Sequence, residues 1–200
     1  MASILMVAGE GLPFIKTGGL ADVIGSLPQA LTERGHEVKV VMPLYKKISD
    51  KYYNELHFDC EYSVSINYHE VPVRVFSKVV DNVCFFFIQH QGYFERDSLY
   101  GYQDDGERGY FQKAVIEMLN QLNYWPNIIH CHDWHTGMIP CMVKETHDAD
   151  PRYRAIRFVY TIHNMAYQGN FGPEMLDSCL GLPYYLLDNG NVRFDGGIHS

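Results

Sequence analysis

The sequence predicts an α/β fold built on a mostly parallel sheet that includes an antiparallel portion. A strand, an amphipathic helix and a second strand follow one another over residues 3–43, an order typical of a parallel βαβ unit. Three β-rich runs then crowd into residues 60–90 with short polar breaks, which favours antiparallel hairpins. Strands at 127–131 and 157–163 alternate with helical segments, so the parallel part of the sheet is expected to continue.

Hydrophobic periodicity defines the first unit, in which the two strands cover 3–8 and 36–43. A helix is expected at 19–34, where Pro28 lacks a backbone N–H and should introduce a kink. Gly35 is placed to end this helix. The apolar residues at helical spacing are Leu20, Val23, Ile24, Leu27 and Leu31.

The antiparallel strands are expected at 60–69, 71–80 and 82–90, with a tight turn at 81–82. The Gly- and Asp-rich stretch 96–109 is predicted to be a loop.

Two helices and a second long loop complete the expected elements. The helices cover 110–122 and 136–146, and the loop covers 164–175. The apolar residues expected to face inward from the first helix are Phe111, Val115, Met118, Leu119 and Leu122. Residues 191–200 carry no clear terminal element, so we expect that the sequence is cut from a longer chain.

Composition excludes several classes of protein. The chain has 200 residues, enough for one domain, and a formal net charge of −8 without a dense basic patch, which excludes nucleic acid as a partner. No apolar run reaches the ~20 residues needed to span a membrane. No basic region precedes the first apolar run, so no signal peptide is expected. Five scattered cysteines fit reduced thiols in the cytoplasm. The start of the sequence shows no transit peptide, which favours a bacterial origin.

The stretch from Lys16 to Gly19 opens the first predicted helix and is a candidate anion site. Backbone N–H groups at a helix start bind anions, and glycines allow a ligand to approach closely. Lys16 adds a charge, although a solvent-facing lysine in a turn would give the same pattern. Neither common nucleotide motif fits, because Phe14 replaces the third glycine of GxGxxG and no GxxxxGK[ST] sequence is present. A dinucleotide-binding dehydrogenase domain is therefore disfavoured.

The histidine-rich stretch 130–135 suggests either a metal site or a hydrogen-bonded histidine cluster. No second ligand pair with short spacing follows it, so the hydrogen-bonded cluster is the better interpretation. Polar residues follow three expected strands, at Gly9–Glu10, at 130–135 and at His163–Asn164. Because ligands lie beyond the carboxyl ends of parallel strands, these clusters are expected to converge at one edge of the sheet.

Three stretches together resemble the N-terminal half of bacterial glycogen synthases and plant starch synthases. They are "KTGGLADVIGSLP", "HCHDWHTGM" and "TIHNMAYQG", and "DSLYGYQDDGERGYFQKA" is similar to the same family. The resemblance covers essentially all of residues 1–200 in the right order. It implies a Rossmann-like N-terminal domain of a two-domain GT-B glycosyltransferase. It also implies retaining transfer of glucose from ADP-glucose to the non-reducing end of an α-1,4-glucan, without a cofactor or a metal.

The resemblance also implies roles for particular residues. His163 and Lys16 would take part in catalysis. The residues implied on the donor side are Lys16, Gly18, Gly19, Asp133, His163 and Asn164. The residues implied on the acceptor side are Glu10, Tyr100, Trp134 and His135. Tyr102 is an alternative to Tyr100, because both lie in the same loop.

A complete enzyme of this family has a second, C-terminal domain with most of the donor contacts, and we expect that domain to be absent from residues 1–200. The chain is then one half of a glucosyltransferase and inactive alone. The alternative is a glucan-binding module without catalysis, in which the aromatic side chains serve only to bind sugar. Neither interpretation involves nucleic acid or a membrane.

Overall fold

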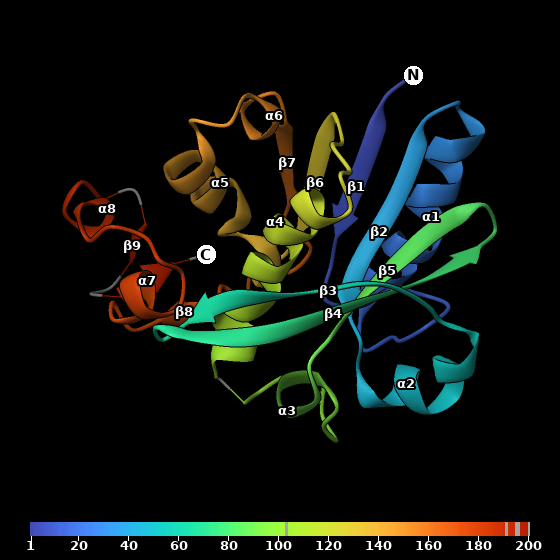
Figure 1. Ribbon diagram of the computed structural model, residues 1–200, viewed down its shortest axis with the longest axis horizontal. Helices are drawn as coiled ribbons and strands as arrows, with labels where there is room; N and C mark the ends of the chain where they lie inside the picture. The colour runs from blue at the N-terminus through green and yellow to red at the C-terminus, as the bar shows by residue number, and fades with distance from the viewer. Residues whose placement is uncertain (103, 191, 195–196, 200) are drawn as a thin grey trace.

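The computed structural model describes residues 1–102, 104–190, 192–194 and 197–199, and its centre is a seven-stranded sheet (Figure 1). The strand order is β3-β4-β5-β2-β1-β6-β7. From β5 to β7 neighbouring strands are parallel, whereas β3, β4 and β5 pair antiparallel. The predicted fold class is therefore confirmed. The strands are β1 (Ser3–Val7), β2 (Glu37–Pro43), β3 (His57–Ile66), β4 (His69–Val80), β5 (Val83–Gln89), β6 (Ile128–His132) and β7 (Arg157–Thr161).

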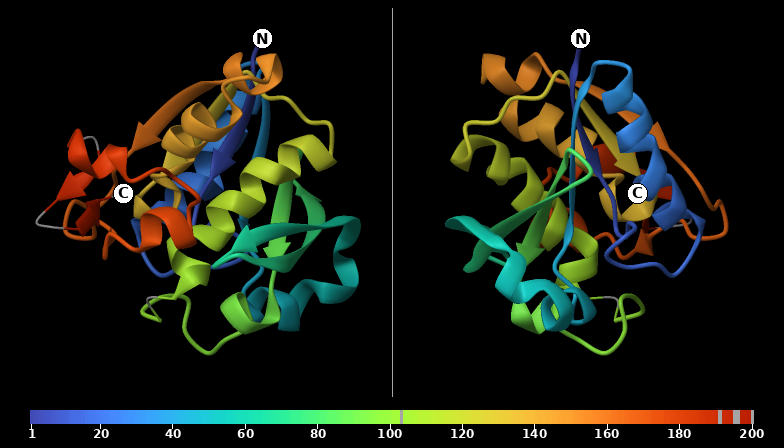
Figure 2. Two further views of the ribbon diagram at one scale, coloured as in Figure 1. Left: turned by 60° about the vertical axis from the view of Figure 1, so that its left-hand side comes forward. Right: turned by 90° about the vertical axis from the view of Figure 1, so that its right-hand side faces the viewer.

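Helices cover both faces of this sheet. The right-hand view of Figure 2 shows α1 on one face and α4 and α5 on the other. Strand β1 therefore lies in the centre of the core, where Leu5, Met6 and Val7 have no exposed surface. The main helices are α1 (Gly19–Glu33), α4 (Phe111–Gln121) and α5 (Ile139–His147). The shorter ones are α2 (Lys46–Tyr52), α3 (Gln91–Phe94), α6 (Pro151–Arg154), α7 (Met175–Ser178) and α8 (Tyr185–Asp188).

Two tight turns fix the antiparallel portion. Asn67 and Tyr68 have φ of 50° and 63°, and Asp81 and Asn82 have φ of 50° and 64°. Positive φ at both central residues is the geometry of the type I′ turn, whose twist matches that of paired strands. The turn at 81–82 is confirmed. The first strand was misplaced, because it ends at Ile66, before the turn at Asn67, and begins already at His57.

Helix α1 confirms the first predicted helix. It runs through Pro28, and Gly35, with φ of 86°, follows its end, where the N–H of His36 bonds to the carbonyl of Leu31. The kink at Pro28 stays a prediction.

Two helix starts were predicted too early. A π-helical turn at Gly106–Tyr110 precedes α4 and interrupts the predicted loop at 96–109. A 3-10 turn at Trp134–Thr136 precedes α5, whose first turn contains Pro140, a residue suited to a helix start. Of the residues expected to face inward from α4, Leu122 is only partly buried.

The last part of the chain packs against the turn between β3 and β4 and against α5. The N–H of Asn67 bonds to the Ser178 carbonyl, and the Tyr185 hydroxyl bonds to Glu145. The predicted loop at 164–175 contains β8 (Asn170–Phe171), which pairs with β10 (Gly197–His199), and β10 pairs with β9 (Arg193–Phe194). Short strands thus occur in a stretch where no terminal element was expected. Residues 191, 195, 196 and 200 of that stretch lie outside the described residues. In the described part of the chain, no helix is long and apolar enough to cross a membrane.

Candidate functional site

The three polar clusters predicted to converge do meet at one edge of the sheet. They follow the parallel neighbours β1, β6 and β7, and they surround a cavity of about 640 Å³. The residues in its wall that were predicted on the donor side are Gly18, Gly19, Asp133, His163 and Asn164. The residues in its wall that were predicted on the acceptor side are Glu10, Tyr100, Trp134 and His135. Tyr167 also lines the cavity, and its signal in the sequence was its place in the loop directly after the third cluster.

The loop before α1 is folded around a carboxylate of the chain itself. Glu10 is 3% exposed, and its carboxylate accepts the backbone N–H of Thr17 at 2.7 Å and of Gly18 at 3.0 Å. The Thr17 hydroxyl donates to the same carboxylate. Two of the N–H groups predicted to bind an external anion are therefore already occupied. Sequence reasoning did not foresee this buried acid, and an anion site at the loop stays a prediction that rests on Lys16 and Gly19.

Lys16 lies next to the cavity wall rather than in it. Its Nζ lies 2.7 Å from both carboxylate oxygens of Asp22, and the two side chains are 48% and 54% exposed. An ion pair this exposed contributes little to stability and exchanges readily for another anion. The ion pair therefore keeps Lys16 near the cavity, and the fold does not depend on this lysine for its stability.

The two glycines of this loop are not required by the backbone. Gly18 has φ of −150°, which any residue can adopt, and Gly19 is the first residue of α1. A Cβ atom at Gly18 would meet its nearest neighbour, Glu10 Oε1, at 3.6 Å, and a Cβ atom at Gly19 would meet nothing within 4 Å. Packing within the chain therefore does not explain either glycine, whereas both leave room for a ligand in the cavity.

Asp133 joins the ends of β6 and β7. Its φ of 59° and ψ of 179° form a strained conformation for a residue with a side chain, which costs on the order of 1–3 kcal/mol. The strain is held by two hydrogen bonds, from the Asp133 N–H to the Thr161 carbonyl at 3.0 Å and from the His163 N–H to Asp133 Oδ1 at 2.7 Å. Asp133 thereby fixes the backbone at His163.

The histidines predicted to form a cluster were His130, His132 and His135. The structure instead joins His130 and His132 with His163, and both ring nitrogens of His135 are buried without a hydrogen-bond partner among the described residues. His130 Nε2 lies 2.7 Å from Thr161 Oγ1, and His132 Nδ1 lies 2.9 Å from His163 Nε2. The rings of His130 and His132 stack with centroids 4.0 Å apart. The predicted hydrogen bonding is thus observed for His130 and His132 but not for His135. Among the described residues, no three His, Cys, Asp or Glu side chains are arranged to hold a metal ion.

The three rings predicted on the acceptor side contact one another. The centroid of the His135 ring lies 3.6 Å from that of Trp134 and 4.5 Å from that of Tyr100, with the ring planes tilted by 31° and 35°. Tyr102 instead lies against the guanidinium of Arg96, 3.6 Å from its ring centroid. The structure therefore places Tyr100, and not Tyr102, at the cavity. Glu10 differs from Tyr100, Trp134 and His135, because its carboxylate is hydrogen-bonded to the loop before α1.

Buried histidines make the stability of the fold dependent on pH. Desolvation lowers the pKa of His135 to about 3, and desolvation, His130 and His163 together lower the pKa of His132 to about 3. Both rings gain a proton on unfolding once the pH falls below ~6.5, the pKa of a free histidine. The unfolded state then binds more protons, so stability is expected to fall as the pH decreases from 6.5 to 3. Urea denaturation at pH 7 and pH 4.5 measures this loss.

A His135→Phe variant is expected to lose less stability than the original chain between these two pH values. Replacement of the exposed His69 by glutamine is the matched control for the loss of a histidine outside the core. An unaltered pH dependence in the His135→Phe variant would contradict the assignment.

Replacement of Glu10 by glutamine is expected to loosen the loop before α1. The amide offers one oxygen where the carboxylate offers two, and hydrogen bonds to charged groups are worth about 1.5–3 kcal/mol. Hydrogen exchange at the Thr17 and Gly18 amides should therefore accelerate by roughly 10–100-fold. The Glu33→Gln variant, at the far end of α1, is the control. Unchanged exchange at both amides would show that Glu10 does not hold the loop.

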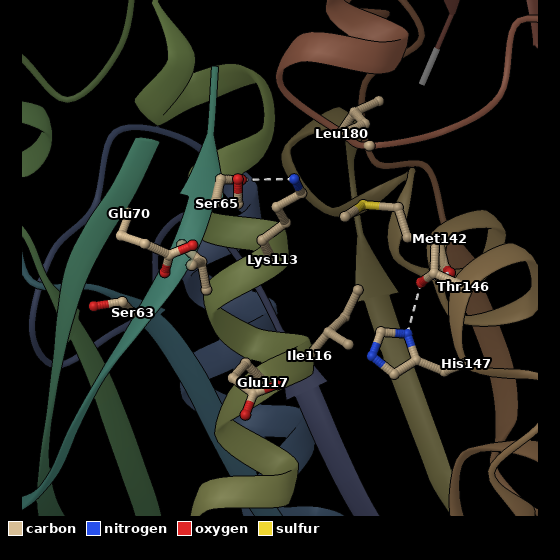
Figure 3. Close-up of a pocket in the computed structure, with 12 residues that line it drawn as sticks. Ser63, Ser65, Glu70, Lys113, Ile116, Glu117, Met142, Thr146, His147 and Leu180 are labelled. Carbon is tan, nitrogen blue, oxygen red and sulfur yellow. Dashed lines mark hydrogen bonds between the residues drawn. The ribbon is translucent and has the colours of Figure 1, made fainter. Parts of the chain in front are cut away.

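A second cavity, of about 310 Å³, lies between β3, α4 and α5 (Figure 3). Lys113 reaches across it and donates from Nζ to the Ser65 carbonyl at 2.7 Å. Burial lowers the pKa of this lysine. None of the residues in its wall belongs to the first cavity, and none was singled out from the sequence.

Sequence comparison relates this chain to glycogen and starch synthases. The family model described as the starch synthase catalytic domain matches residues 3–200. The glycogen synthase of Clostridium kluyveri is 43% identical over 196 residues, which are 98% of this chain and 41% of that protein. The glycogen synthase of Streptococcus agalactiae serotype III is 43% identical over 193 residues, 96% of this chain and 40% of that protein.

A solved structure is also similar to this chain. It is the catalytic domain of starch synthase IV from Arabidopsis thaliana bound to ADP and acarbose, with a TM-score of 0.86 and 29% identity. The similarity covers 99% of this chain and 42% of that one. The chain therefore spans about two fifths of the length of the proteins it matches.

Proposed function

Because the chain belongs to the starch synthase catalytic domain family, we propose that it is the N-terminal, acceptor-side domain of a retaining glucosyltransferase. The reaction moves glucose from ADP-glucose to the non-reducing end of an α-1,4-glucan. A second domain, which completes a GT-B architecture and supplies most of the donor contacts, is proposed to lie outside the 200 residues. The similar proteins are named glycogen synthases, and the similar solved domain is bound to ADP and acarbose.

The observation that carries this proposal is the composition of the 640 Å³ cavity. Its wall combines the glycine loop before α1 with polar residues that follow β6 and β7. A loop with room for an anion then faces hydrogen-bonding groups and a cluster of aromatic rings, which suit a sugar. A nucleotide-sugar and a glucan chain require these two chemistries side by side.

The donor diphosphate is proposed to bind near Lys16 and Gly19. Negative charge grows on the leaving phosphate as the glycosidic bond breaks, and fixed positive charge stabilises it. Glu10 already occupies the N–H groups of Thr17 and Gly18, so Lys16 is the group of this loop most able to turn from Asp22 to a phosphate. Gly19 has no side chain and no neighbour within 4 Å of a Cβ position, which leaves space for the diphosphate to approach the loop.

The transferred glucose is proposed to lie against His163 and Asn164. Asn164 Oδ1 accepts the N–H of Ala166 at 2.9 Å, which leaves the Asn164 Nδ2 group to donate to a hydroxyl. His163 is oriented by Asp133 and His132. The reaction is proposed to need no metal or cofactor, and the free thiols of the chain fit a protein of the cytoplasm.

The test is glucose transfer by the complete protein. We expect transfer from radiolabelled ADP-glucose to a maltooligosaccharide with the α configuration retained, and no transfer by residues 1–200 alone. Binding of the oligosaccharide without any transfer would favour the glucan-binding module instead. Transfer by residues 1–200 alone would contradict the assignment of most donor contacts to a second domain.

A further inference from the structure

His132 is buried at the end of β6, and the only hydrogen-bond partner of its side chain in the described part of the chain is His163. The His132 side chain has no exposed surface, and its Nδ1 lies 2.9 Å from His163 Nε2. The two rings are nearly coplanar, with an interplanar angle of 15°. Side-by-side rings at this distance share one proton between the two facing nitrogens, so one ring donates and the other accepts.

The surroundings of His132 determine which ring donates. Burial together with the neighbouring histidines lowers the pKa of His132 to about 3, so the ring is neutral and carries one N–H. Its Nε2 is buried without a hydrogen-bond partner among the described residues. A buried N–H without an acceptor is rarer than a buried acceptor without a donor. The proton therefore belongs on Nδ1, where it is donated to His163 Nε2.

We propose that His132 is a positioning residue that holds His163 in the tautomer with hydrogen on Nδ1, so that His163 offers an N–H donor to a ligand in the 640 Å³ cavity. A sugar hydroxyl as that ligand rests on the proposed function. The tautomer itself rests only on the contacts of the two histidines.

The rest of the cluster supports this role. The backbone N–H of His163 is bound by Asp133 at 2.7 Å, so both ends of the His163 residue are fixed. His130 stacks on the His132 ring but directs its own Nε2 to Thr161, at 2.7 Å. His130 therefore packs against His132 without contributing to the hydrogen bond on His163, which makes it a matched control.

The experiment is 15N NMR of the complete protein labelled with [15N]histidine, without substrate. The imidazole 15N shifts distinguish a protonated from an unprotonated nitrogen, and we expect His163 to show Nδ1 protonated and Nε2 unprotonated. In His132→Leu the Nε2-protonated form, which free histidine favours, should dominate. His132→Asn should restore the original tautomer, because the asparagine amide can donate near the position of Nδ1. His130→Leu should leave it unchanged.

A protonated Nε2 on His163 in the unsubstituted protein would overturn the proposal, even if the His132 variants fail to fold. The rate of glucose transfer is a second, independent measurement of the role of His132. His132→Leu should lower kcat/KM for the donor about tenfold, the effect of one lost hydrogen bond, and His132→Asn should recover most of it. Equal losses in His132→Leu and His132→Asn would contradict positioning. Absence of transfer in the unsubstituted protein would refute the proposed function but not the tautomer.

Discussion

Replacement of Lys16 by alanine in the complete protein is expected to lower kcat by about 10²–10³-fold, the usual cost of removing one donor to a developing negative charge. Stability should change little, because Lys16 forms only an exposed ion pair with Asp22. The measurement is steady-state glucose transfer, together with urea denaturation of the same variant.

The chain offers a closely matched control for this substitution. Lys46 is 47% exposed and pairs with Asp97 at 3.2 Å, and Lys16 is 48% exposed. Lys16 directly precedes Thr17, a residue of the cavity wall, whereas neither sequence neighbour of Lys46 lines that cavity. The Lys46→Ala variant should therefore keep its full turnover. Wild-type kcat in Lys16→Ala, or an equal loss in both variants, would remove the role assigned to Lys16.

Replacement of Gly11 by alanine is expected to destabilise the fold by about 1–3 kcal/mol, the cost of overpacking a core. A Cβ atom at Gly11 would lie 2.5 Å from Cγ2 and 3.1 Å from Cβ of Ile24. Ile24 is fully buried in α1, and a β-branched side chain in a helix has one strongly preferred rotamer. The clash is therefore relieved only by moving α1 away from the end of β1.

Gly19→Ala is the contrasting variant. Its Cβ atom meets nothing within 4 Å, so stability should be unchanged or raised by up to about 1 kcal/mol. In the complete protein the same variant should bind ADP-glucose more weakly, because the added methyl group narrows the approach to the loop. Urea denaturation of Gly11→Ala and Gly19→Ala tests the first expectation, and equal stability of the two variants would contradict it.

The parts of the fold that were predictable from the sequence are those with strong periodicity. The βαβ unit over residues 3–43 carries both a strand pattern and a helix pattern, and the structure reproduces it. The antiparallel portion was predictable because the type I′ turn at 81–82 has its own sequence signal. Helices of four residues, such as α3 and α6, show less than two turns of periodicity, so nothing in the sequence separated them from loops.

Helix starts were the main source of error. The π-helical turn at Gly106–Tyr110 has no distinctive sequence pattern, and its last residues share the apolar pattern of α4. The start of α5 depends on the 3-10 turn at Trp134–Thr136, which follows the strained Asp133. These features arise from tertiary contacts, which local sequence patterns do not contain.

The location of the candidate site was predictable, whereas its internal pairing was not. Convergence of the three clusters follows from the parallel order of β1, β6 and β7. The bond between Glu10 and the loop at 17–18 depends on the path of the chain between β1 and α1, which has no repeating pattern. The choice between Tyr100 and Tyr102 likewise required the loop conformation.

The carboxylate of Glu10 means that the glycine loop is preorganised. Its three hydrogen bonds to Thr17 and Gly18 form during folding, so the conformational entropy of this loop is lost before any substrate arrives. A ligand that binds a loop already ordered retains more of its interaction energy as affinity. Binding of the donor then requires a conformational change in one side chain only, that of Lys16. The backbone of the loop does not have to rearrange.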